Sequence, residues 1–73
     1  LSSKENDVLL LLCRHRNKLV DRSQILKAVW STDNYFAARS LAVYINHLRN
    51  YLKTEQGVKI MSVHGKGYKL VLN

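Results

Sequence analysis

Side chains that can hydrogen-bond nucleic acid recur at helical spacing in the segment 39–53. No acidic residue interrupts this segment. At about 100° per residue, one side of a helix here carries amides, an imidazole and a small apolar group. The members are Val43, Asn46, His47 and Asn50, with Arg39 beyond the N-terminal end and Arg49 and Lys53 along one flank. Such groups can contact base edges and phosphates in a DNA major groove, so the pattern predicts a recognition helix over about 40–53.

The opposite side of the same segment is apolar and predicts a core-facing stripe. The stripe consists of Leu41, Ile45, Leu48 and Leu52. Two positions of the segment 39–53 outside this stripe leave alternatives open. Val43 would meet either a thymine methyl group or water, and Arg49 would bind either a phosphate or Glu55. For Arg49 we favour the phosphate.

The charge of the chain is strongly positive and unevenly distributed. Twelve Lys and Arg against five Asp and Glu give a net charge of +7 over 73 residues. Residues 34–73 carry six bases and one acid, whereas residues 1–33 carry six bases and four acids. This asymmetry indicates a polyanionic partner bound mainly through the C-terminal half. A basic surface that simply faces water is the alternative.

Several classes of protein are disfavoured by length and cysteine content. A chain of 73 residues makes one small domain, 1–73, without room for a deep substrate cleft. The single Cys13 excludes an internal disulfide and a multi-cysteine zinc site. The longest apolar run, 8–13, is far shorter than the roughly 20 residues that span a bilayer. We expect a cytoplasmic domain with no metal, no cofactor, no membrane contact and no enzymatic activity.

Two further helices are expected before the recognition helix. Ser2 and Glu5 have the spacing of a capping box, which predicts a helix from there to about His15. Asp21 and Gln24 resemble a second capping box, which opens a helix through Trp30. Residues 19–20 suit a very short strand. This order of helices is that of a helix-turn-helix.

The connection from Ser31 to Ala38 is longer than the turn of a minimal helix-turn-helix. It contains two aromatic residues, Tyr35 and Phe36. These side chains either pack beneath the next helix or face a protein partner. We expect packing.

The chain ends in two β-rich runs, 58–63 and 68–72, which predict a hairpin. Gly65 and Lys66 suit a two-residue type II′ turn. A nucleotide-binding loop is excluded because such loops run from a strand into a helix. A basic hairpin tip beside a recognition helix instead predicts a wing, with His64 and Lys66 reaching the DNA backbone or the minor groove. The predicted fold is therefore α+β, a winged helix-turn-helix of three helices and a C-terminal hairpin.

Four blocks of sequence resemble a known family along essentially the whole chain. The blocks are Leu1-Ser2-x-x-Glu5, then Leu19-Val20-x-Arg22-x-Gln24-Ile25-Leu26-x-x-Val29-Trp30, then Arg39-Ser40-Leu41-x-Val43-Tyr44-Ile45-x-x-Leu48-Arg49-x-x-Leu52, and Val63-x-Gly65-x-Gly67-Tyr68. They closely resemble the C-terminal effector domain of OmpR/PhoB-type response regulators. These are bacterial transcription regulators of two-component systems.

The resemblance implies specific roles for residues of this chain. Positions that match family contacts to the DNA backbone are Trp30, Arg39, Tyr44, Arg49 and Tyr68. Asn46 and His47 match the major-groove face, and Ser62 and His64 match wing contacts. The resemblance also implies a phosphorylatable receiver domain and a small sheet before the first helix, so the chain is expected to be a fragment. The segment 31–38 matches a region that touches RNA polymerase in some members.

Departures from the family pattern affect the expected base preference. Ala42 stands where an acid is usual, Asn46 and His47 stand where Arg or Lys is frequent, and His64 stands where Arg is common. Without bidentate Arg contacts to guanine, and with Asn suited to adenine, we expect a site rich in A·T.

Two other functions are weighed against DNA binding. A small ribonuclease would need His47 and His64 to act together as acid and base. A winged helix used only for protein contact would act through Tyr35, Phe36 and the wing, and would not need a basic recognition face.

Overall fold

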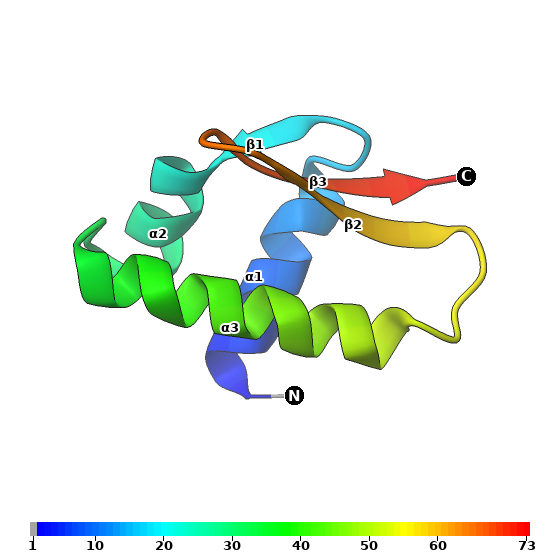
Figure 1. The fold of residues 1–73 in the computed structure, drawn as a ribbon, viewed down its shortest axis with the longest axis horizontal. Helices are drawn as coiled ribbons and strands as arrows, with labels where there is room; N and C mark the ends of the chain where they lie inside the picture. Colours follow the sequence, from blue (N-terminus) through cyan, green and yellow to red (C-terminus); the bar gives the residue numbers. More distant parts are fainter. Residues whose placement is uncertain (1) are drawn as a thin grey trace.

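The computed structural model describes residues 2–73, and Leu1, the first residue of the resemblance, lies outside them. The described elements are α1 (Ser3–Arg14), β1 (Leu19–Asp21), α2 (Arg22–Trp30), α3 (Tyr35–Leu52), β2 (Val58–Val63) and β3 (Gly67–Leu72). The strands form an antiparallel sheet in the order β1-β3-β2. Figure 1 shows α3 extending along one side of the molecule, with the sheet on the opposite side and α1 passing behind α3 toward the sheet. The predicted α+β winged-helix fold is confirmed.

The first helix begins as its sequence predicts. The Ser2 hydroxyl accepts from the Glu5 backbone N–H at 3.2 Å, and the Ser2 N–H donates to Glu5 Oε1 at 3.2 Å. This reciprocal pair satisfies two backbone donors that a helix start would otherwise leave free. The helix ends at Arg14, one residue before the predicted position.

The second capping box predicted from the sequence is wrong. Asp21 makes no side-chain hydrogen bond to the helix that it precedes. It is instead the last residue of β1, where it pairs with Gly67 of β3. The N–H of Arg22 donates to the carbonyl of Lys66 at 2.9 Å. At the start of α2, a backbone carbonyl of the wing thus takes the place of the predicted side-chain cap as hydrogen-bond acceptor.

The third helix begins earlier than the sequence analysis predicted. Asn34 Oδ1 accepts from the Ala37 N–H at 2.9 Å and caps a helix that starts at Tyr35. The connection after α2 is therefore short, from Ser31 to Asn34, and the predicted loop to Ala38 is wrong. Tyr35 and Phe36 lie in the first helical turn with 70% and 76% of their surface exposed. The expectation that they pack beneath the helix is also wrong, because the first turn directs them outward.

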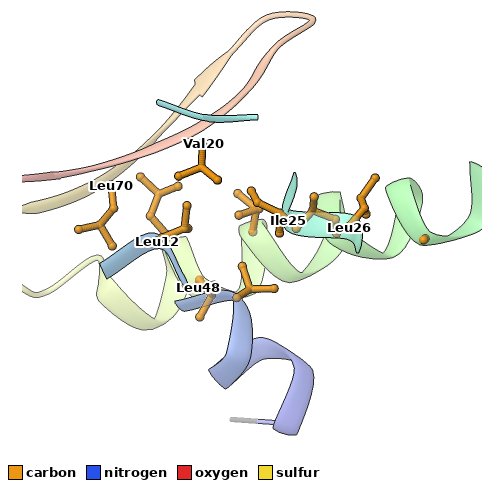
Figure 2. Packing of buried hydrophobic residues seen from close by; sticks show 11 residues of the cluster. Leu12, Val20, Ile25, Leu26, Leu48 and Leu70 are labelled. Carbon is orange, nitrogen blue, oxygen red and sulfur yellow. The ribbon is translucent and has the colours of Figure 1, made fainter. Parts of the chain in front are cut away.

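The core lies between the sheet and the three helices, and it is entirely apolar within residues 2–73. Its members are Val8, Leu12, Val20, Ile25, Leu26, Ala37, Leu41, Ile45, Leu48, Ile60 and Leu70. Figure 2 shows side chains from the sheet, such as Val20 and Leu70, directed toward Leu12 and Leu48 of the helices. The strand β1, although it has three residues, adds a third strand to the hairpin and closes the core beside α2.

The wing turn differs in type from the prediction. Val63 pairs with Gly67, so the loop comprises the three residues 64–66 rather than two. The Lys66 N–H donates to the Val63 carbonyl at 3.0 Å, and Gly65 occupies the third of the four turn positions with φ +71°. A positive φ there is the property of a type II turn, not of a type II′ turn. Gly65 is still required for its positive φ, but at the second central position of the turn and not at the first.

Candidate nucleic-acid interface

Helix α3 has the buried face and the exposed polar face that the sequence predicts. Leu41, Ile45 and Leu48 are at most 1% exposed. The opposite side is exposed along its length, at Val43, Asn46, His47 and Asn50. Burial of the leucine and isoleucine stripe therefore fixes the rotation of the helix about its axis and leaves the amides and the imidazole in solvent.

A carboxylate from another helix reaches this outward side. Glu5 Oε2 of α1 lies 3.1 Å from His47 Nδ1. The Glu5 side chain is 13% exposed, whereas that of His47 is 56% exposed. The segment 39–53 has no acid of its own, but the folded surface around it does. Local sequence pattern could not indicate this contact, because the two residues are 42 positions apart.

Glu5 is held in its ionised form by its surroundings. Hydrogen bonds from the Ser2 side chain and backbone lower the pKa of the Glu5 carboxyl below its ordinary value of 4.5, and His47 lowers it further. Desolvation raises the pKa of Glu5, but the net shift is still downward. Glu5 is therefore an anionic acceptor for both the cap and the imidazole at neutral pH.

Aromatic rings continue the surface from α3 onto α2. The rings of Trp30 and Tyr44 stack with centroids 5.5 Å apart, and Tyr44 in turn lies 6.4 Å from the His47 ring. The Lys4 ammonium sits 5.6 Å from the centre of the Trp30 ring and 3.4 Å from the Val29 carbonyl. The fold thus gathers Trp30, Tyr44 and His47, all predicted site residues, and adds Lys4, which sequence reasoning missed.

Arg49 joins α3 to the wing. Its Nε donates to the Ile60 carbonyl at 3.1 Å, and one terminal nitrogen donates to Ser62 Oγ at 2.5 Å. The other terminal nitrogen is 3.4 Å from Asn46 Oδ1. The alternative of an ion pair with Glu55 is wrong, because the guanidinium lies over β2. Two further predicted residues, Ser62 and Asn46, are brought together around it.

The tip of the wing is cationic. A hollow there is lined by His64 and Lys66 together with Ser62, Tyr68 and Arg22. Arg22 comes from the start of α2, held there by the bond from its N–H to the Lys66 carbonyl. Arg22 was not among the predicted binding residues, because nothing in the sequence links it to the wing.

The remaining predicted residues lie toward the two ends of α3. Arg39 and Val43 line a hollow with Phe36, Ser40 and Tyr44 near the start of the helix. Lys53 lies near its end, in a groove shared with Arg49 and with Lys59 of β2.

The histidines of the ribonuclease alternative occupy separate surroundings. His47 contacts Glu5 of α1, while His64 lines the hollow at the wing tip. Among residues 2–73 no cluster of three or more His, Cys, Asp or Glu side chains has the geometry to hold a metal ion. Within the same part of the chain, none of the helices has the length and apolar character needed to cross a bilayer.

Comparison with known proteins places the geometry in context. Residues 1–70 match the family model described as "Transcriptional regulatory protein, C terminal". The transcriptional regulatory protein RprY of Bacteroides fragilis is 49% identical over 71 residues, which are 97% of this chain and 30% of RprY. This chain therefore spans about a third of the length of that curated relative.

Two solved structures share the fold closely. The DNA-binding domain of Bacillus subtilis CssR superposes with a TM-score of 0.80 at 31% identity, covering 97% of this chain and 77% of that one. The C-terminal domain of the lantibiotic response regulator NsrR gives a TM-score of 0.79 at 30% identity, covering 96% and 71%.

Proposed function

Because the chain belongs to the family of C-terminal domains of transcriptional regulatory proteins, of the OmpR/PhoB type, we propose that it binds double-stranded DNA sequence-specifically. The family is not one of enzymes. In this proposal the outward side of α3 enters the major groove and reads base edges. The wing at residues 64–67 contacts the backbone or the adjacent minor groove.

The observation that carries the proposal is the exposed polar side of α3. This helix has 18 residues and so extends about 27 Å. Asn46, His47 and Asn50 are exposed on it while its opposite stripe is buried. A helix of this kind fits a major groove about 12 Å wide, and its amides match the donor and acceptor pair that adenine presents there.

Cationic groups surround this side of the helix and suit the phosphates that border the groove. Arg22 and Lys66 meet at the wing tip beside His64, and Arg39 lies near the start of α3. Lys53 and Lys59 lie at its other end. With Trp30, Tyr44, Arg49, Ser62 and Tyr68, these residues form the proposed DNA surface. Val43 is 45% exposed on it, open to a thymine methyl group.

Selection of bound sites from a random duplex pool, followed by fluorescence anisotropy on single-base variants, tests this function. We expect a site rich in A·T. Asn46→Ala and Asn50→Ala should relax the preference at single positions by about 1 to 3 kcal/mol. Arg16→Ala is the matched control, because Arg16 lies in the turn between α1 and β1, away from α3 (Figure 1). Equal affinity for all duplexes would contradict sequence-specific reading.

A second surface supports a protein contact beside DNA binding. Tyr35 and Phe36 form an exposed edge-to-face pair with centroids 5.8 Å apart at the start of α3. The segment 31–38 is the one that the family resemblance connects with RNA polymerase, and we extend the proposal to such a contact. Tyr35→Ala should lower transcription from a bound promoter while leaving duplex affinity unchanged, because Tyr35 does not line the hollow that holds Arg39 and Val43.

The longer protein is proposed to be a two-domain regulator. This chain spans about 30% of the length of RprY, which leaves room for a receiver domain whose phosphorylation controls the effector domain. Phosphate transfer from a small phosphodonor to the longer gene product, and its absence with residues 1–73 alone, would test this.

A further inference from the structure

The contact between His47 and Glu5 determines which hydrogen-bonding groups the imidazole can present. An ionised carboxylate has only acceptor oxygens. The 3.1 Å contact therefore requires Nδ1 to carry the proton. In a neutral imidazole the other nitrogen, Nε2, is then an acceptor.

We propose that Glu5, reaching across from α1, sets the tautomer of His47 so that its Nε2 atom selects an amino-bearing base in the groove. This inference rests on the proposed DNA-binding function. In the major groove, adenine N6 and cytosine N4 donate hydrogen bonds, whereas guanine O6 and thymine O4 accept them. An outward acceptor favours the first pair and is repelled by the second. Glu5 is thus a positioning residue that acts through His47.

The position of Glu5 is itself determined by a second, independent contact. The Ser2 N–H donates to Oε1, the oxygen that does not face His47. The side chain is 13% exposed, and the whole arrangement is anchored in the first turn of α1. The carboxylate is therefore oriented by the cap before any DNA arrives, with Oε2 left for the imidazole.

The remaining surroundings of the imidazole leave Nε2 available. The nearest aromatic ring is that of Tyr44, at 6.4 Å between centroids and tilted by 31°. Among residues 2–73, Nε2 of His47 has no hydrogen-bond partner. With 56% of its side chain exposed, His47 can present this atom to a base.

Glu5→Gln is a sharp test because Gln also fits the third position of a capping box. The Ser2 N–H requires an oxygen at the Oε1 site, so the new amide must direct its NH₂ group toward His47. That group donates to Nδ1, which moves the imidazole proton to Nε2. The substitution should preserve the helix start and reverse the hydrogen-bonding character of the atom that faces DNA.

The first measurement is ¹⁵N NMR of the free domain at pH 8.5, two units above the ordinary pKa of an imidazole group, about 6.5. The ¹⁵N shifts of His47 should indicate a protonated Nδ1 in the wild type and a protonated Nε2 in Glu5→Gln. Asp7→Asn removes the same charge from α1 and should leave the wild-type tautomer unchanged. The same tautomer in the wild type and Glu5→Gln would overturn the proposal, whether or not the domain binds DNA.

The second measurement is binding at pH 8.5 to four duplexes that differ at the base pair whose preference His47→Ala abolishes. The wild type should favour an amino base there, and Glu5→Gln should shift the ratio of amino to keto base by about 2- to 10-fold toward the keto base. The shift should vanish in the double variant with His47→Ala. An unchanged ratio, or no position sensitive to His47→Ala, would overturn the proposal while DNA binding stands. Failure of the wild type to bind any duplex would instead overturn the proposed function.

Discussion

Arg49 shows how a residue selected for ligand binding can first stabilise the fold. Its guanidinium donates to the Ile60 carbonyl and to Ser62 Oγ, both in β2. These bonds connect the last turn of α3 to β2, the strand that leads into the wing. In the proposed complex, the same contacts would hold the wing at a defined distance from the groove.

Arg49→Ala should therefore lower the free energy of unfolding by about 1 to 2 kcal/mol, because the Ile60 carbonyl and the Ser62 hydroxyl lose a charged donor. Urea denaturation measures this. Lys53→Ala is the control, since it removes a positive charge one turn later from an exposed site. If both variants unfold at the same urea concentration, the contacts to β2 do not stabilise the domain.

The stability of the domain should depend on the ionisation of Glu5. Its folded pKa lies below the ordinary value of 4.5 because of hydrogen bonds from Ser2 and then His47. A carboxyl group of this kind contributes stability above its unfolded pKa and loses that contribution as the pH falls through its folded pKa. The stability difference between the wild type and Glu5→Gln should shrink as the pH is lowered from 5 toward 2.

Thermal unfolding across that pH range measures the effect, with Asp7→Asn as the control for loss of an acid from the same helix. Glu5→Gln keeps the capping pattern, so the variant should fold at neutral pH. A stability difference that grows with acid would contradict the assigned hydrogen bonds.

At the scale of elements, the wing depends on two glycines for different reasons. A Cβ atom at Gly67 would lie 2.0 Å from the Val20 carbonyl oxygen and 2.9 Å from the Arg22 nitrogen. Gly67 therefore permits β1 to pair closely with β3. At Gly65 nothing lies within 4 Å, but φ is +71°. Gly67 is required by close packing, and Gly65 is required by its backbone conformation.

Gly67→Ala should cost about 3 kcal/mol or more, because the new methyl group meets rigid backbone. Gly65→Ala should cost only about 1 to 2 kcal/mol, the usual penalty for a left-handed residue with a side chain. Urea denaturation of the two variants compares these losses directly. Equal losses, or a larger loss at Gly65, would mean that β1 can shift to accommodate a side chain.

At the scale of the whole molecule, the proposed interface is assembled from α2, α3 and the wing. With 4 to 6 phosphates contacted, log affinity should fall against log salt with a slope between about −3.6 and −5.4. Lys66→Ala should weaken all duplexes alike and make the slope shallower by about 0.9. Anisotropy titrations from low to high salt measure both effects. Arg16→Ala should leave the slope unchanged, and a wild-type slope near zero would remove the electrostatic basis of binding.

Much of the fold could be predicted from local pattern. The period of Leu41, Ile45 and Leu48 predicted which side of α3 is buried, and the capping box at Ser2 and Glu5 predicted where α1 begins. Both depend on residues within a turn or two of each other. The start of α3 was predicted too late in the chain. Asn34 caps the helix, but the two aromatic residues that follow it were assigned to the preceding loop.

What the sequence by itself determined is therefore a basic, two-faced helix followed by a glycine-tipped hairpin, since periodicity and turn chemistry act over a few residues. Only the tertiary structure decided that Glu5 contacts His47, that Arg49 lies over β2, and that Arg22 joins Lys66 at the wing. These contacts span 42, 11 to 13, and 44 positions of the chain. No periodic pattern encodes such pairs, because they arise when packing of the apolar core brings separate elements side by side.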